Sequence, residues 1–492
     1  MRHVCIHGHF YQPERANPWT GTIDRQESAA PHHDWNERIC SESYAPNATA
    51  RILGPDGEVL RTRNNYATIS FDFGPTLLAW LEKNGPGTYE AVLAADREGR
   101  RRFHGHGPAI CQPYGHSILP LDSERDRRTQ LLWGIRDFEH RFGRRPEGIW
   151  FPECAVDTPS LVAAAEAGLG FAVLAPHQAE AVRATNSSDW QPLEPGEVDT
   201  RNAYRCPLPD DRELALFFYD GPVSHDVSFG DGLADGAALA HRLAAMPGEA
   251  GQIVSIATDG ETYGHHHRFG EMALATCLET LESLPGVELT VFPAFLETHP
   301  PADEVRVREN SSWSCVHGVE RWRAACGCHT GLNPGWNQEW RRPLRAAVEW
   351  LRDALAPIYE EQAGRLLRDP WQARDRYIDV LLEPGEAAVS NFLADHAGGI
   401  LDDKQRRRAL GLLEMQRWAL LVFTSCGWFF DDVSELTSVQ VMRSACRAIE
   451  LCLELAGTDL EPGFVDILYA AQSNIPEQGT GADIYRRLAR QR

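Results

Sequence analysis

Acidic and imidazole side chains follow three apolar, strand-like runs of the chain. His7 and His9 extend the run "HVCI", Glu153 follows "GIWF", and Asp259 and Glu261 follow "IVSIA". In a sheet of parallel strands, functional groups gather where the strands end and the loops begin. The three clusters could therefore share one pocket.

Two of these acids suit glycosidic-bond chemistry. Retaining glycoside hydrolysis needs one carboxylate as nucleophile and one carboxylic acid as proton donor, roughly 5 to 5.5 Å apart. Glu153 and Asp259 meet the requirement of residue type. Because the proton donor must start protonated, we expect burial and the negative charge of Glu153 to raise the pKa of Asp259.

The histidines suggest a metal site as an alternative. His7 and His9 have the spacing of two residues on one face of a strand, so they could bind a metal or form a buried, hydrogen-bonded pair. His265, His266 and His267 are consecutive, so their side chains diverge and cannot easily face one ion. We therefore expect "TDGETYGHHH" to be an acid site in which the histidines position sugar hydroxyls.

The pattern of elements changes near residue 300. Before it, short apolar strands alternate with amphipathic helices, which predicts a parallel sheet covered by helices. After Pro300, long segments with helical spacing and almost no strand signal predict an all-helical domain. Residues 14–65 form an excursion after the first strand that we expect to act as a lid, with a hairpin across "PDGE".

Composition narrows the class of protein. With 492 residues and 43% hydrophobic content, the chain is long enough for two or three domains. A net charge of −22 without a basic stripe argues against a nucleic-acid partner. No apolar run is long enough for a signal peptide or a membrane span, and the twelve cysteines are dispersed, so we expect a cytoplasmic protein with reduced thiols. Fourteen tryptophans, several in polar loops, suit sugar rings.

Three ordered motifs carry a family resemblance. "HGHFYQP" (7–13), "GIWFPECAVD" (148–157) and "TDGETYGHH" (258–266) resemble the motifs of glycoside hydrolase family 57. "DWNERICSESYAPN", "FGPTLLAWL" and "QPYGHSILPL" resemble further landmarks of that family. The likeness covers residues 1 to about 300. "SSWSCVHGVERWRAACGCHTG" and "TSCGWFFDDVSE" resemble the helical, formerly uncharacterised extension of one branch.

The resemblance implies a fold and an activity. The expected fold is an incomplete (β/α)7 barrel over residues 1–300, followed by an all-helical domain over 301–492 that completes the cleft. The expected activity is that of a retaining α-glucan hydrolase or transglycosylase of the amylase, 4-α-glucanotransferase or branching type. Matched residue by residue, Glu153 is the nucleophile and Asp259 the general acid/base. The expected substrate-binding residues are His7, His9, Gln12, His116, Trp150, Glu261, His265, Trp313 and Trp428.

The chain departs from the family pattern at two places. Phe10 and Tyr11 separate His9 from Gln12, whereas the family's first motif usually reads His-Gln-Pro. The helical domain reads Cys-Gly-Trp at 426–428 where better known branching enzymes carry Ser-Asp-Trp.

Two other functions stay open. A metal-dependent polysaccharide deacetylase or zinc mannosidase-like hydrolase on a related barrel would use His7, His9 and Asp259 as ligands. A non-catalytic α-glucan-binding protein would use the same acids as polar cleft residues. For the preferred function we expect an α-glucan substrate, no cofactor and no catalytic metal. The oligomeric state is not predicted.

A cysteine-rich stretch allows two interpretations. Cys315, His317, Cys326, Cys328 and His329 offer enough thiolate and imidazole for zinc, although Cys-x-Cys lacks the usual Cys-x2-Cys spacing. We prefer a thiol-bearing loop near the sugar cleft, because tryptophans flank the stretch.

Overall fold

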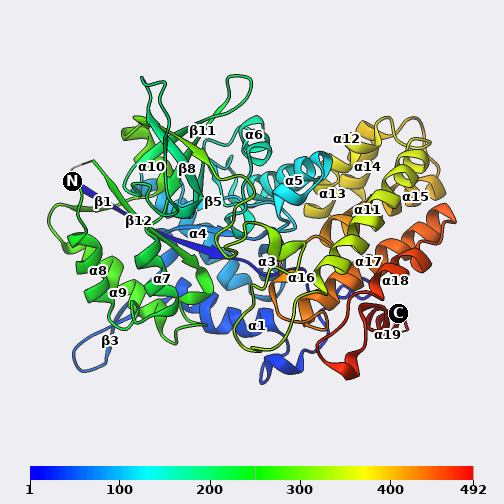
Figure 1. Ribbon diagram of the computed structural model, residues 1–492, viewed down its shortest axis with the longest axis horizontal. Helices are drawn as coiled ribbons and strands as arrows, with labels where there is room; N and C mark the ends of the chain where they lie inside the picture. Colours follow the sequence, from blue (N-terminus) through cyan, green and yellow to red (C-terminus); the bar gives the residue numbers. More distant parts are fainter. Residues whose placement is uncertain (250, 491–492) are drawn as a thin grey trace. The chain divides into compact units, whose positions relative to one another are not determined.

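The computed structural model describes residues 1–249 and 251–490, and these form two compact units (Figure 1). The barrel unit contains residues 1–12, 25–112 and 141–309. The helical unit contains residues 13–24 and 113–140 and the chain from Asn310 onward. The boundary that the sequence predicts near residue 300 assigns residues 13–24 and 113–140 to the barrel domain, whereas in the structure they belong to the helical unit.

Seven parallel strands build the barrel among the described residues. They are β12 (Ile253–Asp259), β1 (Arg2–Phe10), β4 (Ser70–Phe73), β5 (Ala109–Ile110), β6 (Gly148–Ile149), β7 (Phe171–Leu174) and β11 (Glu213–Phe218), in this spatial order. A parallel bridge from Cys111 to Ile149 joins β5 to β6. From β11 back to β12, the Asp220 amide donates to the Ser255 carbonyl at 2.7 Å. The predicted incomplete (β/α)7 barrel is confirmed.

Helices follow most of these strands. They are α3 (Pro75–Asn84), α4 (Pro86–Arg102), α6 (Thr158–Glu166), α7 (Gly221–Phe229), α8 (Gly236–Ala245), α9 (Gly270–Ser283) and α10 (Phe292–Thr298). Aspartates cap three of them: Asp157 begins α6, Asp220 begins α7 and Asp235 begins α8, each accepting a backbone amide of the first turn. These caps fix where the strand-to-helix loops end.

Four more strands extend the sheet that contains β6, β7 and β11. They are β10 (Ala203–Pro207), β14 (Asp303–Val307), β8 (Ala179–Ala184) and β9 (Gln191–Pro192). β14 lies where we expected the helical domain to have begun. Val305 and Val307 are buried, and Arg183 pairs with the buried Glu304 at 2.5 Å. Asp303, Glu304 and Arg306 interrupt the apolar residues, so a search for apolar runs does not detect this strand.

The helical unit is built from helices, of which α5 (Glu124–Phe142) is cyan and the later ones are yellow to red in Figure 1. The later helices are α11 (Arg341–Ala363), α12 (Pro370–Arg376), α13 (Ile378–Leu382), α14 (Glu386–His396), α15 (Asp403–Leu421), α16 (Cys426–Phe429), α17 (Leu436–Ala456), α18 (Glu461–Leu468) and α19 (Gly481–Ala489). α15 packs on α17, and α11 packs on both α15 and α18. Across the described residues, no helix is both long and apolar enough to cross a membrane.

The excursion after β1 has its own structure. It holds α1 (Trp35–Ile39), a π-helical turn (Cys40–Tyr44), α2 (Ala45–Ala48) and the hairpin of β2 (Ala50–Leu53) and β3 (Val59–Arg63). The two strands of this hairpin pair antiparallel across "PDGE", as predicted. Ser43 donates to the carbonyls of Gly260 and Tyr263, which fastens the excursion to the loop after β12.

Candidate active site

Three strand ends carry the central polar residues of the barrel. His9 on β1 is paired with Asp259 on β12 and with Asp72 on β4. Paired residues on adjacent parallel strands project from the same face of the sheet. Asp72, His9 and Asp259 therefore form a row across β4, β1 and β12.

Asp72 holds both histidines of the first motif. His7 Nε2 lies 3.0 Å from one oxygen of Asp72, and His9 Nδ1 lies 2.8 Å from the other. Both imidazoles stack on the buried Trp150, with ring centroids 4.7 and 5.3 Å away. His7 and His9 therefore form a buried, hydrogen-bonded pair that Asp72 joins. Asp72 was missed from the sequence, although an acid inside the apolar run "ISFDF" is an unusual signal.

The two histidines have different electrostatics. Burial lowers the pKa of His7 despite its bond to Asp72. Burial also opposes charge on His9, but Asp72, Asp259 and Glu261 together raise its pKa to about 9. His9 is therefore a cation at neutral pH, enclosed among carboxylates.

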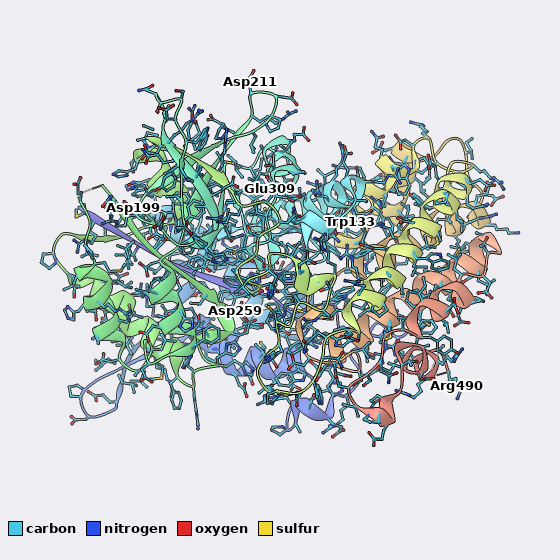
Figure 2. All side chains as sticks on the ribbon, viewed as in Figure 1. Trp133, Asp199, Asp211, Asp259, Glu309 and Arg490 are labelled. Carbon is cyan, nitrogen blue, oxygen red and sulfur yellow. The ribbon has the colours of Figure 1, made fainter. Side chains whose placement is uncertain are left out.

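Asp259 is a carboxyl group whose pKa is raised toward neutrality. It lies at the end of β12 (Figure 2). Burial raises its pKa to about 7, as do Glu261, Glu153 and Asp72, while the His9 cation works in the opposite direction. The expected contributions of burial and of Glu153 are both present. The effect of Glu153 also means that the two carboxyl groups are close enough to interact.

Glu153 lies on a strained turn directly after β6. Glu153 has φ 58° and Cys154 has φ 48°, a left-handed conformation that non-glycine residues rarely adopt. Such residues cost on the order of 1–3 kcal/mol each and persist only where their surroundings hold them. Gln178 is part of that support, because its Nε2 donates to the Cys154 carbonyl at 2.7 Å and its Oε1 accepts the Ala175 amide at 2.9 Å. The turn fixes the Glu153 carboxylate at the carboxyl end of the barrel.

Glu261 belongs to a buried network with the excursion. Tyr44 donates its hydroxyl to Glu261 Oε1, and Gln12 Nε2 lies 3.5 Å from the same oxygen and 3.2 Å from the Tyr44 hydroxyl. Burial raises the pKa of Glu261. Tyr44 was not among the predicted site residues, although it lies in "DWNERICSESYAPN", one of the stretches that resemble family 57.

The three consecutive histidines diverge only in part: His265 and His267 contact different segments, whereas the His266 ring packs against His265 with ring centroids 5.2 Å apart. His265 pairs with Glu42 and packs edge-on against Trp35 at 6.0 Å. His267 Nε2 lies 2.8 Å from the Ser228 carbonyl, while burial lowers the pKa of His266 to about 4. In residues 1–249 and 251–490, a single group of three or more metal-type ligands converges, and it contains none of these histidines.

The other predicted binding residues lie in the helical unit. His116 has φ 53°, and its Nδ1 lies 2.7 Å from Ser425 Oγ. Trp313 is half-buried. Trp428 is fully buried and donates its Nε1 to the Arg341 carbonyl at 3.1 Å, a core position in this structure. Sugar binding by these three residues stays a prediction.

Gln112 is a candidate that the sequence reasoning missed. It follows β5, and its side chain is buried. Neither its amide nitrogen nor its amide oxygen has a hydrogen-bond partner within the described part of the chain. An unpaired buried amide is costly, so a polar ligand at this strand end would be favoured.

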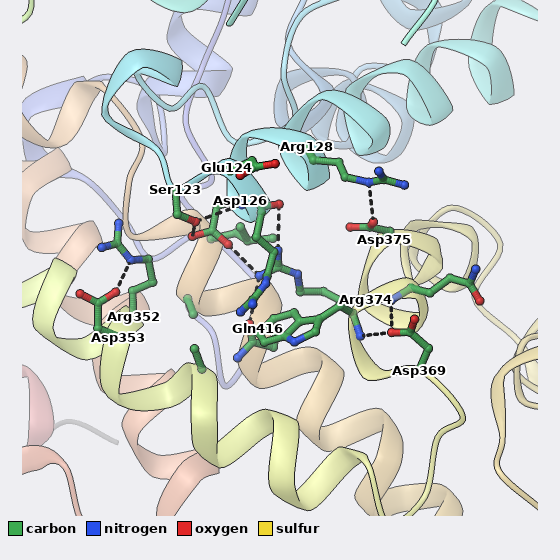
Figure 3. Close-up of a pocket in the computed structure, with 16 residues that line it drawn as sticks. Ser123, Glu124, Asp126, Arg128, Arg352, Asp353, Asp369, Arg374, Asp375 and Gln416 are labelled. Carbon is green, nitrogen blue, oxygen red and sulfur yellow. Dashed lines mark hydrogen bonds and ion pairs between the residues drawn. The ribbon is translucent and has the colours of Figure 1, made fainter. Parts of the chain in front are cut away.

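The helical unit has a pocket of its own, of about 680 Å³ (Figure 3). Charged residues line it, but many of them pair with one another: Arg374 Nη1 lies 2.7 Å from Asp126, and Arg128 Nε lies 3.1 Å from Asp375. Paired charges of this kind favour a structural role for the pocket.

Two family models match separate parts of the chain. Glycosyl hydrolase family 57 matches residues 104–308, and a domain of unknown function (DUF3536) matches residues 336–492. Alpha-amylase 1 of Dictyoglomus thermophilum is 28% identical over 138 residues, which are 28% of this chain and 18% of that protein. The chain thus spans less than a fifth of that curated relative.

Solved structures share the fold at low sequence identity. An exo-type maltose-forming amylase from Pyrococcus sp. ST04 superposes with a TM-score of 0.73 at 15% identity, covering 99% of this chain and 91% of its own. A branching enzyme from Thermococcus kodakaraensis gives 0.57 at 14% identity, covering 99% and 94%. A 4-alpha-glucanotransferase from Thermococcus litoralis gives 0.55 at 14% identity, covering 92% and 60%. The solved structures share the fold of this chain, residues 104–308 belong to glycosyl hydrolase family 57, and residues 336–492 match a domain of unknown function.

Proposed function

We propose that this protein is a retaining α-glucan hydrolase or transglycosylase. The proteins to which the chain is similar are an alpha-amylase, a maltose-forming amylase, a 4-alpha-glucanotransferase and a branching enzyme. One observation carries the proposal. Glu153 and Asp259 stand at the carboxyl ends of β6 and β12, and the Glu153 charge helps to keep the Asp259 proton in place near neutral pH.

In the first step, a Glu153 oxygen attacks the anomeric carbon of the sugar. The bond from that carbon to the glycosidic oxygen breaks, and Asp259 gives its proton to the departing oxygen. The products are a glycosyl ester on Glu153, an ionised Asp259 and a shortened glucan that carries the proton.

In the second step, Asp259 acts as a base. It takes a proton from water or from an acceptor sugar hydroxyl, whose oxygen attacks the anomeric carbon and releases Glu153. Two displacements on opposite faces retain the α configuration. Water gives hydrolysis, and an acceptor sugar gives transfer.

Neighbouring residues tune this pair. The His9 cation limits how far the pKa of Asp259 rises, and Asp72 keeps that cation in place at 2.8 Å. Gln112 offers an amide to a sugar hydroxyl at the end of β5. We also propose that the segment 14–65 acts as a lid and that activity requires both units.

A product profile tests the proposal. Purified protein is incubated with maltoheptaose and with amylose, and NMR follows the first anomer released. We expect an α-anomer, with longer chains if transfer dominates, new 1,6 links if the enzyme branches, and short sugars alone if it hydrolyses. Release of a β-anomer contradicts retention, and absence of turnover favours the glucan-binding alternative.

The proposed location is the cytoplasm. The twelve cysteines are dispersed along the chain, a pattern that fits reduced thiols in a reducing compartment. Cell fractionation with an antibody to the protein tests this, and recovery outside the cytoplasm contradicts it.

A further inference from the structure

Four side chains of the helical unit converge on one point. Cys315, His317, Cys326 and Cys328 each offer one ligand atom, and these atoms all lie within 4.8 Å of one another. They belong to the segment between β14 and α11, whose only regular element is a single turn at Glu320–Trp322. The proposed catalytic pair has no part in this cluster.

The separations match a tetrahedral metal centre. Zinc bonds of about 2.3 Å to sulfur and about 2.0 Å to nitrogen, set at tetrahedral angles, separate two sulfurs by about 3.8 Å and a sulfur from a nitrogen by about 3.5 Å. Cys315 Sγ lies 3.8 Å from Cys326 Sγ and 3.7 Å from Cys328 Sγ, and Cys328 Sγ lies 3.5 Å from His317 Nδ1. A disulfide, with sulfurs about 2.05 Å apart, does not describe these contacts.

The backbone explains how unusual spacing forms this cluster. Gly318 has φ 80°, and its amide donates to the Cys315 carbonyl at 3.0 Å, so the chain turns directly after His317. Gly327 has φ 85° and separates Cys326 from Cys328. A left-handed glycine between two cysteines turns the backbone, so that both thiols can face the same point. Sequence spacing alone therefore underestimated the cluster.

Surrounding groups suit thiolate ligands. Three thiolates with one Zn²⁺ have a net charge of −1, and the buried Arg341 supplies the opposite charge: its Nη1 lies 4.0 Å from Cys326 Sγ and donates to the Cys328 carbonyl at 2.8 Å.

His329 does not join the cluster. Its Nδ1 accepts the Gly331 amide at 2.9 Å, so it is engaged within its own turn. The four remaining ligands make a complete tetrahedral set, which leaves no open position for substrate or water.

We propose that Cys315, His317, Cys326 and Cys328 bind one structural Zn²⁺ ion. Soft thiolates with one imidazole at tetrahedral separations favour zinc over magnesium, calcium or manganese. The ion would fasten an irregular segment of about 30 residues to α11 through Arg341, and its binding free energy would add to folding.

Metal content tests the site directly. The full chain is produced with zinc and without chelator, and elemental analysis and X-ray absorption are measured. We expect about one zinc per chain, with sulfur and nitrogen neighbours at the distances given above. Cys326→Ser and His317→Ala should lose most of the zinc, whereas His329→Ala, the matched control one residue from Cys328, should keep it.

A second measurement does not depend on whether variants fold. Reduced, metal-depleted wild-type protein with an unchanged circular dichroism spectrum is titrated with Co²⁺. We expect thiolate charge transfer and tetrahedral d–d bands that saturate at one ion per chain and disappear on addition of zinc. Failure to bind either ion, a zinc content unchanged in His317→Ala, or a Cys315 disulfide in protein isolated with zinc would each overturn the proposal.

Discussion

His9 and Asp259 occupy paired positions on the neighbouring parallel strands β1 and β12. The register places a cation beside the proposed acid, while Glu261 and Glu153 supply the opposing negative charge. The pKa of Asp259, about 7, is therefore a balance that single substitutions can move in either direction.

The first prediction concerns the pH dependence of kcat/KM. Asp259 must be protonated when it meets substrate, so activity should fall as the pH rises through about 7. Glu261→Gln removes a negative charge that raises the pKa of Asp259, so the alkaline limb should move to lower pH. His9→Asn removes a positive charge that lowers it, so the limb should move to higher pH.

A pH profile of each variant on maltoheptaose provides the measurement. Glu166→Gln, an exposed position on the barrel unit, is the control and should leave the limb in place. If the alkaline limb moves in the same direction in both site variants, a group other than Asp259 sets that limb.

The second prediction concerns truncation. A chain ending at Pro300 keeps Asp126 and Trp133 but loses Arg374, whose guanidinium pairs with Asp126 at 2.7 Å and whose carbonyl accepts Trp133 Nε1 at 3.1 Å. Removing one partner of a buried ion pair costs about 3–5 kcal/mol. We expect this chain to be inactive and largely insoluble, as measured by expression, circular dichroism and turnover.

The control keeps every residue but cuts the chain. A protease site inserted at the exposed Gly385 should leave the nicked protein folded and active. A soluble, fully active protein ending at Pro300 would contradict the proposed need for both units.

The third prediction concerns the segment from Pro18 to Asn65. Its central part is anchored, because Asn47 Nδ2 donates to the Tyr263 carbonyl at 2.7 Å, so substrate should change cleavage mainly at its exposed stretches. Limited proteolysis with and without maltoheptaose should show slower cleavage within 18–34. Cleavage near the exposed Ile400 serves as the control and should not change. Cleavage within 18–34 at the same rate with and without maltoheptaose would count against a lid.

The sequence predicted long features better than short ones. β1, β7, β11 and β12 are apolar runs that periodicity detects. β5 has two residues and β14 combines three charged residues with two valines, so neither resembles a buried strand in isolation. Their place is set by pairing with neighbours that are distant in the chain.

The sequence likewise indicated some residues of the site and not others. Motif order indicated Glu153 and Asp259, because both follow strand-like runs. Asp72 could not be assigned from its surroundings, since only the register of β4 with β1 places it opposite His9. The zinc cluster depends on the positive φ angles of Gly318 and Gly327, which the spacing of cysteines does not reveal.

The fourth prediction separates structural metal from catalysis. No proposed chemical step uses a metal, so protein depleted of zinc but still folded at 20 °C should keep its turnover of maltoheptaose. Its thermal midpoint should fall by roughly 5 °C or more, because a bound ion stabilises only the folded state. Calorimetry and initial rates before and after chelation measure both. Loss of activity without loss of stability would point to a catalytic metal instead.

The last prediction assigns the two carboxyl groups by chemical rescue. Glu153→Ala removes the nucleophile and should lower kcat by several orders of magnitude, equivalent to roughly 4 kcal/mol or more of barrier. Azide can occupy the space left by the carboxylate and attack an activated α-glycosyl substrate directly, giving the β-glycosyl azide. In Asp259→Ala the glycosyl ester still forms on Glu153, so azide attack on that ester should give the α-glycosyl azide. NMR of the products distinguishes the two anomers, and Glu166→Ala, with near wild-type turnover and no azide product, is the control. An α-azide from Glu153→Ala would mean that another residue is the nucleophile.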